Sequence, residues 1–183
     1  GDATGRLVIH PWRALRQRAG GEPERQVLLD GPVLSLARIR DAWVAATGEG
    51  LFRIEQQRVR QVFIRDEQGR AFPVSATVLV TIDAERLLVG TADGSILELL
   101  GVDLRPVVPA CGGRITALRA DGDRLWIGME GRGLQLGHTG TRQPLVRLRP
   151  GGEICGNHVT HLARHRGRLV AGTFDRGACV LTG

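Results

Sequence analysis

Several residue types are scarce or missing in this chain of 183 residues, and each absence narrows the functions to consider. There is no lysine and no tyrosine, Met129 is the one methionine, and aromatic residues make up 4% of the chain. A lectin that stacks sugars on aromatic platforms is therefore not expected. No apolar run reaches the roughly 18–20 residues of a membrane-spanning helix. Residues 1–4 lack the basic and then apolar stretch of a signal peptide, and we expect a cytoplasmic rather than a periplasmic location.

The formal net charge is +6, and every basic residue counted in it is an arginine. A basic domain raises the question of nucleic acid or another anionic surface. The arginines are scattered, often at predicted turns, and acidic residues are interspersed among them. Because clustered rather than total charge marks a nucleic-acid interface, we do not expect nucleic-acid binding.

Internal repetition is the most informative feature of the sequence. Leu36, Leu79, Leu118 and Leu162 fall into register at spacings of 43, 39 and 44 residues. The segments that align on these leucines are residues 33–54, 76–99, 115–136 and 159–181. A period of about 40–45 residues is typical of the four-stranded blades of a β-propeller.

Each copy has the same local pattern. A short apolar strand is followed by a polar turn, a second strand, a glycine turn and a third strand, and a more variable stretch completes the unit. Strands this short bury their faces only when neighbouring units stack. The sequence therefore predicts an all-β propeller of four-stranded antiparallel blades, about four to five in this chain. The expected units are a partial blade over 1–30 and repeats over about 31–73, 74–112, 113–156 and 157–183. The best helical candidate, residues 12–18, is short.

Both ends of the chain fall inside a blade. Leu7 lies 44 residues before Leu51, so residues 4–9 resemble a third strand, and residues 26–29 would be the fourth. We expect the chain to be the C-terminal portion of a larger ring of about seven blades, and proteolysis would account for its separation from the N-terminal blades. The alternative is a small self-closing ring of four or five blades.

Two stretches resemble a known family. They are RLWIGMEGRGL (124–134), and NHVTHL (157–162) followed by GRLVAGTFDRG (167–177). Both are similar to the two-component regulator propeller repeat, which reads roughly V-T-x-L, G-R-L-W-x-G-T and G-G-L. Met129 replaces the Thr of that pattern, and Ala178 replaces its Leu. The resemblance implies a β-propeller from bacterial signalling proteins, and it carries no catalytic residues.

One group of residues could be read as a zinc site, because its spacing C-x2-H-x2-H-x3-H places four possible ligands close together in the sequence. The group consists of Cys155, His158, His161 and His165. The structural interpretation is stronger, because His158 belongs to the lead-in of the repeat and neighbouring side chains of a strand point to opposite faces. We expect no metal and keep this set as the alternative. The odd number of cysteines argues against a disulfide framework. Cys111 and Cys155 occupy equivalent apolar repeat positions, where a packing role is expected.

No hydrolase or phosphate-binding motif is present, so an enzyme is not expected, and neither is a cofactor. We expect an interaction or sensor module that binds a protein partner. That partner could be the remaining N-terminal blades or a protease, and the alternative function is a propeller processed by cleavage. Trp43 and Trp126 are expected in the core. The binding candidates lie in loops: Trp12, Arg132, His165, Phe174 and Arg176.

Overall fold

The computed structural model describes residues 7–9, 26–29, 31–56, 58–110, 112–139, 146–148 and 154–181. Within these ranges every extended element is a β-strand, and no helix is found that could cross a membrane. The predicted all-β architecture is confirmed. The helical candidate over residues 12–18 lies outside the described residues.

Four antiparallel sheets follow one another along the chain, and each is called a blade below. Blade 1 consists of β3 (Val33–Ile39), β4 (Ala42–Thr47), β5 (Gly50–Glu55), β6 (Arg58–Arg65) and β7 (Ala71–Pro73). Blade 2 consists of β8 (Ala76–Thr81), β9 (Arg86–Thr91), β10 (Ile96–Leu100) and β11 (Asp103–Val108). Blade 3 consists of β12 (Ile115–Asp121), β13 (Arg124–Met129), β14 (Gly133–His138) and β15 (Val146–Leu148). Blade 4 consists of β16 (Val159–His165), β17 (Arg168–Thr173) and β18 (Ala178–Leu181).

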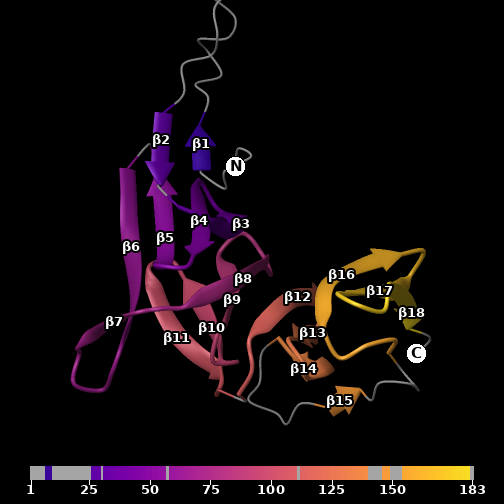
Figure 1. The fold of residues 1–183 in the computed structure, drawn as a ribbon. Coiled ribbons are helices and arrows are strands. Elements are labelled where there is room, and N and C mark those ends of the chain that lie inside the picture. The colour runs from indigo at the N-terminus through magenta and orange to yellow at the C-terminus, as the bar shows by residue number, and fades with distance from the viewer. Residues whose placement is uncertain are drawn as a thin grey trace, which may run out of the picture.

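A separate antiparallel pair precedes the blades. It is formed by β1 (Leu7–Ile9) and β2 (Gln26–Leu29). Figure 1 shows this pair beside β4 and β5, at the end of blade 1. Leu29 is buried there in a cluster with Ala45 and Ile54.

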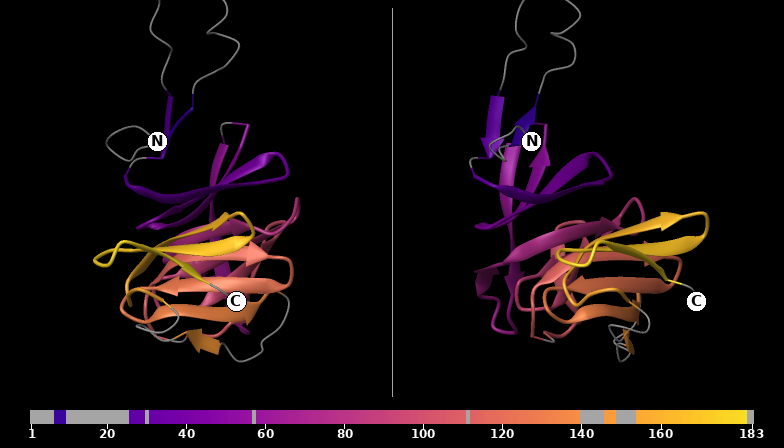
Figure 2. Two further views of the ribbon diagram at one scale, coloured as in Figure 1. Left: turned by 90° about the vertical axis from the view of Figure 1, so that its right-hand side faces the viewer. Right: turned by 45° about the vertical axis from the view of Figure 1, so that its right-hand side comes forward.

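The blades stack face to face in an arc, with β3, β8, β12 and β16 as successive neighbours (Figures 1 and 2). A hydrophobic cluster fills each of the three interfaces between them. At the interface of blades 2 and 3, for example, Leu125, Ile127 and Met129 of β13 are fully buried. Stacking of one sheet against the next therefore supplies the burial that a single blade lacks.

The leucines that mark the repeat differ in burial. Leu79 and Leu118 are each 8% exposed, Leu162 is partly buried, and Leu36 is 40% exposed. Each of them points toward the preceding blade, and blade 1 has no complete blade before it in the described part of the chain. The same position explains Trp43, which we expected in the core and which is 42% exposed. That expectation is wrong, because Trp43 lies on the face of blade 1 that looks away from blade 2, and no complete blade covers that face within the described residues.

A β-bulge recurs at one repeat position in all four blades. The register of the first strand against the second shifts between Val33 and Ser35, and the equivalent shifts lie at Ala76/Val78, Ile115/Ala117 and Val159/His161. The residue skipped by the shift is the threonine of the V-T-x-L pattern in blades 2 to 4, and it is Leu34 in blade 1.

The bulge frees this threonine to connect neighbouring blades. Thr77 Oγ1 donates to Gly90 O of its own blade at 3.0 Å and lies 2.6 Å from Ile115 O of blade 3. Thr116 repeats both contacts, to Gly128 O in its own blade and to Val159 O in blade 4. One hydroxyl thus ties two sheets together at each of these interfaces.

The glycines that accept these bonds are packed tightly. A Cβ added to Gly90 would lie 2.7 Å from Ile115 Cγ2, and one added to Gly128 would lie 2.7 Å from Val159 Cγ1. Blade 1 has Ala46 at this position, and the residue of blade 2 that is equivalent to Ile115 is the small residue Ala76, which belongs to the same cluster. A glycine therefore faces a larger side chain at two interfaces, and two alanines hold the equivalent positions at the third.

Candidate functional site

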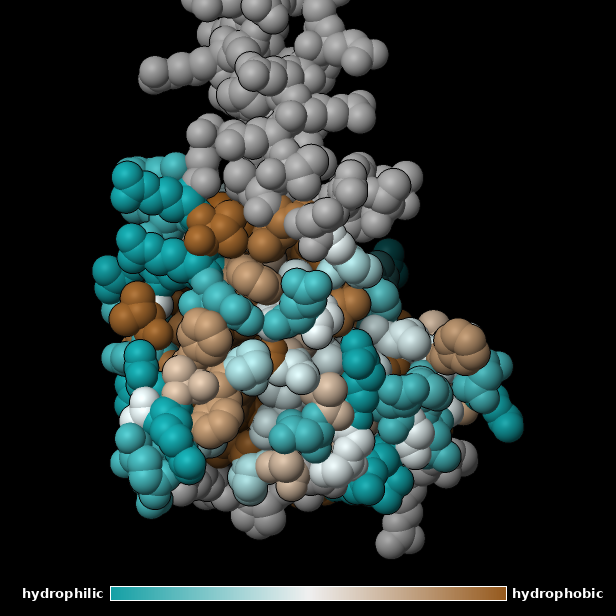
Figure 3. Space-filling model, turned by 60° about the vertical axis from the view of Figure 1, so that its left-hand side comes forward, coloured by the Kyte–Doolittle hydropathy of each residue, from teal (hydrophilic) through white to brown (hydrophobic). Residues whose placement is uncertain are grey.

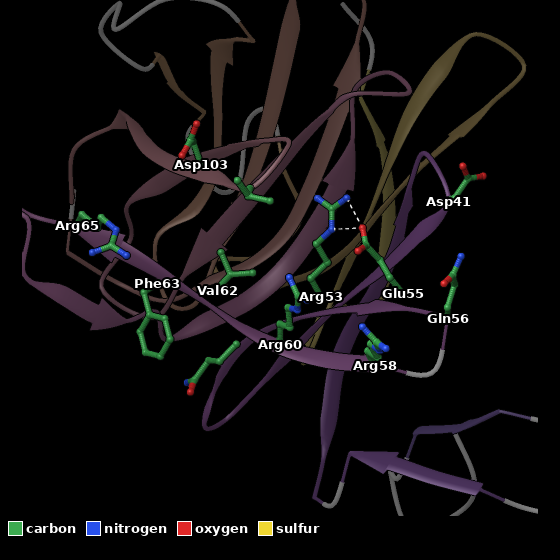
Figure 4. Close-up of a pocket in the computed structure, with 12 residues that line it drawn as sticks. Asp41, Arg53, Glu55, Gln56, Arg58, Arg60, Val62, Phe63, Arg65 and Asp103 are labelled. Carbon is green, nitrogen blue, oxygen red and sulfur yellow. Dashed lines mark hydrogen bonds and ion pairs between the residues drawn. The ribbon is translucent and has the colours of Figure 1, made fainter.

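A groove with a volume of about 710 Å³ lies along β6, between the outer strands of blades 1 and 2 (Figure 4). We call it the β6 groove. It is lined by Asp41, Arg53, Glu55, Gln56, Arg58, Arg60, Gln61, Val62, Phe63, Arg65, Val102 and Asp103. Figure 3 shows the side of the molecule that carries β6, where hydrophilic and hydrophobic side chains are mixed.

The groove follows the edge of the strand. Arg60, Gln61, Val62 and Phe63 are consecutive, and all four line it. Neighbouring residues of a strand point to opposite faces of the sheet, so a cavity that touches all of them must wrap around the strand edge. The β6 groove therefore presents backbone groups as well as side chains.

The local sequence explains why this edge is open. On one side, β5 pairs with β6 from Arg58 to Val62. On the other side, β7 pairs only with Phe63–Arg65 and ends at Pro73, which lies opposite Phe63. Proline has no backbone N–H to extend the ladder. Residues 58–62 therefore have no strand on their outer side within the described part of the chain.

Arg53 is held in place by the protein. Its guanidinium forms an ion pair with Glu55 Oε1 at 2.6 Å and donates to Gly101 O of blade 2. The Arg53 side chain is 15% exposed. The positive charge of Arg53 is therefore balanced by Glu55 from the same strand.

Arg58 and Arg60 differ from Arg53. Both are exposed, and neither makes a hydrogen bond or an ion pair with another described residue. Arg60 lies directly across from Arg53 in the register of β5 and β6. Like charges in directly opposed positions destabilise a sheet, so an anion placed here would remove a repulsion. Arg65, by contrast, donates to Gly69 O at 3.0 Å.

The groove offers ion binding rather than acid–base chemistry. A guanidinium keeps its proton at any physiological pH and acts as a donor only. Glu55, the carboxylate directly across from Arg58 in the register of β5 and β6, is engaged with Arg53. The arrangement suits recognition of an anionic ligand.

A second cavity of about 470 Å³ lies between β7 and β9 and is lined by residues that include Ser75, Asp93 and Ser95. Asp93 is its ionisable group. The Thr91 hydroxyl, and then that of Ser95, donates to Asp93 and lowers the pKa of its carboxyl. The carboxylate is thus already satisfied by its own turn.

The loop residues predicted as binding candidates do not form one site. Phe174 and Arg176 share the β17–β18 turn, where Phe174 is 80% exposed. His165 ends β16 at the β16–β17 turn, which is the opposite end of β17. Arg132 belongs to the β13–β14 turn of blade 3 and packs against Gly113. Trp12 lies outside the described residues.

The histidine and cysteine cluster also takes separate roles. His158 lies 3.4 Å from Glu130 and its ring centroid is 5.7 Å from that of Phe174. His161 and His165 are both on β16. Within the described residues no three His, Cys, Asp or Glu side chains are grouped to hold a metal ion.

Cys155 forms a disulfide with Cys179, with a Cα–Cα distance of 5.8 Å. The expectation that the cysteines form no disulfide, and that Cys155 merely packs, is therefore wrong. The partners are 24 residues apart, and β18 returns Cys179 to the segment that leads into blade 4. An odd cysteine count does not reveal such a pairing. Cys111 lies outside the described residues.

Sequence reasoning also missed the β6 groove. The available signal was the alternation of arginines at positions 58 and 60, which places both on one face of a strand. It was overlooked because β6 belongs to the most variable part of the repeat.

No protein-family model matches the chain, and no curated protein matches it in sequence. Solved structures do match. The extracellular domain of the putative hybrid two-component system BT4673 from B. thetaiotaomicron has a TM-score of 0.74 at 16% identity, with 98% of this chain and 25% of that chain covered. For the extracellular domain of BT3049 from the same organism, the values are 0.69 at 14% identity, with 87% and 25% covered.

A computationally designed protein, Ika4, is also similar, with a TM-score of 0.61 at 20% identity and with 85% of this chain and 94% of that chain covered. The chain thus spans nearly the whole length of Ika4 and about a quarter of each bacterial domain.

The expected cytoplasmic location is wrong. The bacterial structures that the chain resembles are extracellular domains. A disulfide such as Cys155–Cys179 also persists in oxidising compartments and is rare in the cytosol. Identities this low establish the fold alone, and the four stacked antiparallel sheets are β-propeller blades like those of these extracellular domains.

Proposed function

We propose that this chain is a non-enzymatic ligand-binding module of a bacterial signalling protein, and that its ligand is an anion held in the β6 groove. The observation that carries the proposal is the pair Arg58 and Arg60, exposed and without a partner among the described residues beside a groove of about 710 Å³. Ligand sites commonly occupy concave surfaces of about 300–1,000 Å³. The resemblance to the two-component regulator propeller repeat and the likeness to extracellular domains of two-component systems support the signalling context.

The charges of the groove favour an anionic ligand. Four arginines and three carboxylates line it, but one of the carboxylates, Glu55, is paired with Arg53. Neither of the other two carboxylates, Asp41 and Asp103, forms an ion pair with Arg58 or Arg60 among the described residues, so these two arginines are left to meet an external anion. Charge-assisted hydrogen bonds from guanidinium groups are stronger than neutral ones.

The test uses isothermal titration calorimetry with citrate and inorganic pyrophosphate. We expect the native chain to bind one or both, and the double variant Arg58→Gln/Arg60→Gln to bind at least about tenfold more weakly, since each lost charged hydrogen bond is worth about 1.5–3 kcal/mol. The matched control is Arg124→Gln/Arg168→Gln, which removes two exposed arginines outside the groove. Equal binding by both double variants, or no binding by the native chain, would refute the proposal.

A protein partner is a second proposal, supported by the outer face of blade 1. Leu36 and Trp43 are 40% and 42% exposed on its first two strands. Grouped hydrophobic exposure of this kind marks interaction surfaces. We propose that further propeller blades, from the same or another chain, cover it. Trp43 fluorescence should shift to shorter wavelength when they bind, and the substitution Leu36→Asp should abolish that shift.

A further inference from the structure

We propose that the ligand of the β6 groove is an extended acidic peptide that adds as a strand to the open edge of β6, with its carboxylates paired to Arg58 and Arg60. This inference rests on the proposed function of the groove and names its ligand class.

The backbone of β6 provides the first argument. Its outer edge is open over residues 58–62 because β7 pairs only from Phe63 onward. An unpaired strand edge is a row of N–H and C=O groups that accepts another extended chain. Five residues at about 3.3 Å each give a docking length of about 16 Å. An added peptide would continue the line of β7 beyond Pro73.

The spacing of the arginines provides the second argument. Arg58 and Arg60 are two residues apart on one strand, so they point to the same face at a separation of about 6.6 Å. Alternate side chains of a neighbouring extended peptide have the same spacing. Two acidic residues at positions i and i+2 of the peptide would therefore meet the two guanidinium groups one to one.

The charge balance provides the third argument. Across the sheet, Arg60 faces Arg53 and Arg58 faces Glu55. Glu55 already forms an ion pair with Arg53. A carboxylate arriving from outside would thus reach two cations that lack a partner among the described residues. An uncharged or cationic peptide would gain nothing from them.

The face of β6 opposite to Arg58 and Arg60 suits a different kind of peptide side chain. Val59 and Gln61 alternate with the two arginines and point to the other face of β6, where Val59 packs against the cluster of Leu29, Ala45 and Ile54. The intervening residues of an added strand would lie over them. We therefore expect the recognised pattern to be acidic, apolar, acidic, apolar.

The structure also admits a purely protective role, because charged residues on an edge strand keep it from pairing with another copy of the chain. A protective edge repels added strands whatever their sequence. A binding edge accepts an acidic strand and rejects a neutral one.

The experiment measures binding of the fluorescein-labelled, amidated hexapeptide Thr-Glu-Leu-Glu-Leu-Thr by fluorescence polarisation. We expect binding that weakens as sodium chloride is raised. Replacing both Glu of the peptide by Gln should weaken binding at least tenfold, and so should Arg58→Gln/Arg60→Gln in the protein. The control variant Arg124→Gln/Arg168→Gln should bind as the native chain does.

Two N-methylated peptides test strand addition itself. One carries N-methyl groups on both Glu amides and the other on both Leu amides. A strand paired along one edge uses only alternate amides for that neighbour. One methylated peptide should therefore lose binding at least tenfold, while the other stays within about threefold of the parent. Equal effects of the two would overturn strand addition.

The outcomes separate this inference from the proposed function. If citrate or pyrophosphate binds through Arg58 and Arg60 but the hexapeptide does not, the anion site stands and the peptide inference falls. A sulfated heparin oligosaccharide that binds where the peptide fails would also overturn the inference. If no anion binds, both fall. Far-UV circular dichroism of each variant confirms that the exposed substitutions leave the fold intact.

Discussion

Gly90, at the interface of blades 2 and 3, allows the packing of the blades to be tested with a single methyl group. In the substitution Gly90→Ala, the new Cβ would lie 2.7 Å from Ile115 Cγ2 and 2.8 Å from Val78 Cγ1. Both neighbours are β-branched and have little rotamer freedom, and Ile115 is fully buried. Relieving the contact with Ile115 requires moving one sheet away from the other, and relieving the contact with Val78 requires a shift within blade 2.

The cost follows from these distances. Forcing an extra methyl group into a packed core costs about 1–3 kcal/mol. For a domain of this length, each kcal/mol lowers the melting temperature by about 2–4 °C. Gly90→Ala should therefore lower it by about 2–12 °C. Gly128→Ala should act similarly, because its Cβ would lie 2.7 Å from Val159 Cγ1.

Gly172 is the matched control, since it is the equivalent residue of blade 4. A Cβ there would lie 3.6 Å from His161 Cβ, which is an ordinary contact. Gly172→Ala should leave stability unchanged or raise it by about 0.4–1 kcal/mol, because alanine restricts the unfolded chain. Thermal and urea unfolding followed by far-UV circular dichroism measure all three variants.

A double variant tests the cause of the effect. Ile115→Ala alone should cost about 2–5 kcal/mol through the cavity it leaves. In Gly90→Ala/Ile115→Ala the contact with Ile115 Cγ2 is removed and only that with Val78 remains, so the loss should be smaller than the sum of the two single losses by about 1 kcal/mol or more. Strict additivity, or an equal loss in Gly90→Ala and Gly172→Ala, would refute the packing argument.

Three further predictions concern other features of the blades. Thr77→Val removes the hydroxyl that bonds to two blades and leaves a carbonyl without its partner, so it should lower the free energy of unfolding in urea by about 1–3 kcal/mol. The hydroxyl of Thr160 bonds only to Gly172 O of its own blade, so Thr160→Val should lower it by less. Reduction of the Cys155–Cys179 disulfide, which closes a separation of 24 residues, should lower stability by about 3 kcal/mol in the loop-entropy description, and the double serine variant should be insensitive to reductant. Hydrogen bonds lower the pKa of Asp93 in the folded state, so the Asp93 carboxylate adds to the free energy of unfolding above its unfolded pKa, and this gain is lost as pH falls through the folded pKa. The stability of the native chain relative to Asp93→Asn should therefore decline below about pH 4. A pH-independent difference between the two would contradict this.

The repeat could be predicted from sequence because it depends on local periodicity. Alternation within strands, glycine at turns and a recurring leucine together specify short strands that must stack. The same logic misplaced Trp43, and it gave no reason for Leu36 to be more exposed than the other three leucines of the repeat. A repeat position predicts which face a side chain occupies, but only the neighbouring blade decides whether that face is covered.

The bulge, the disulfide and the β6 groove could not be predicted in this way. The bulge at Thr77 is a property of the register between two strands. The Cys155–Cys179 pair depends on where β18 returns within blade 4. The groove depends on Pro73 ending β7 early, which leaves the neighbouring strand open. Each of these features depends on how particular strands are placed relative to one another, whereas the repeat pattern assigns the same structure to every copy.

The sizes of the facing side chains at the blade interfaces also determine which blade can pack against which. Ala46 shares a cluster with Ala76, whereas Gly90 lies against Ile115. If the first strands of blades 2 and 3 were exchanged, Ala46 would meet an isoleucine and Gly90 an alanine, which gives overcrowding at one junction and a void at the next. Repetitive chains risk joining the wrong neighbours as they fold. Here the mismatch penalises such errors, so sheets that look interchangeable in sequence each have one proper neighbour.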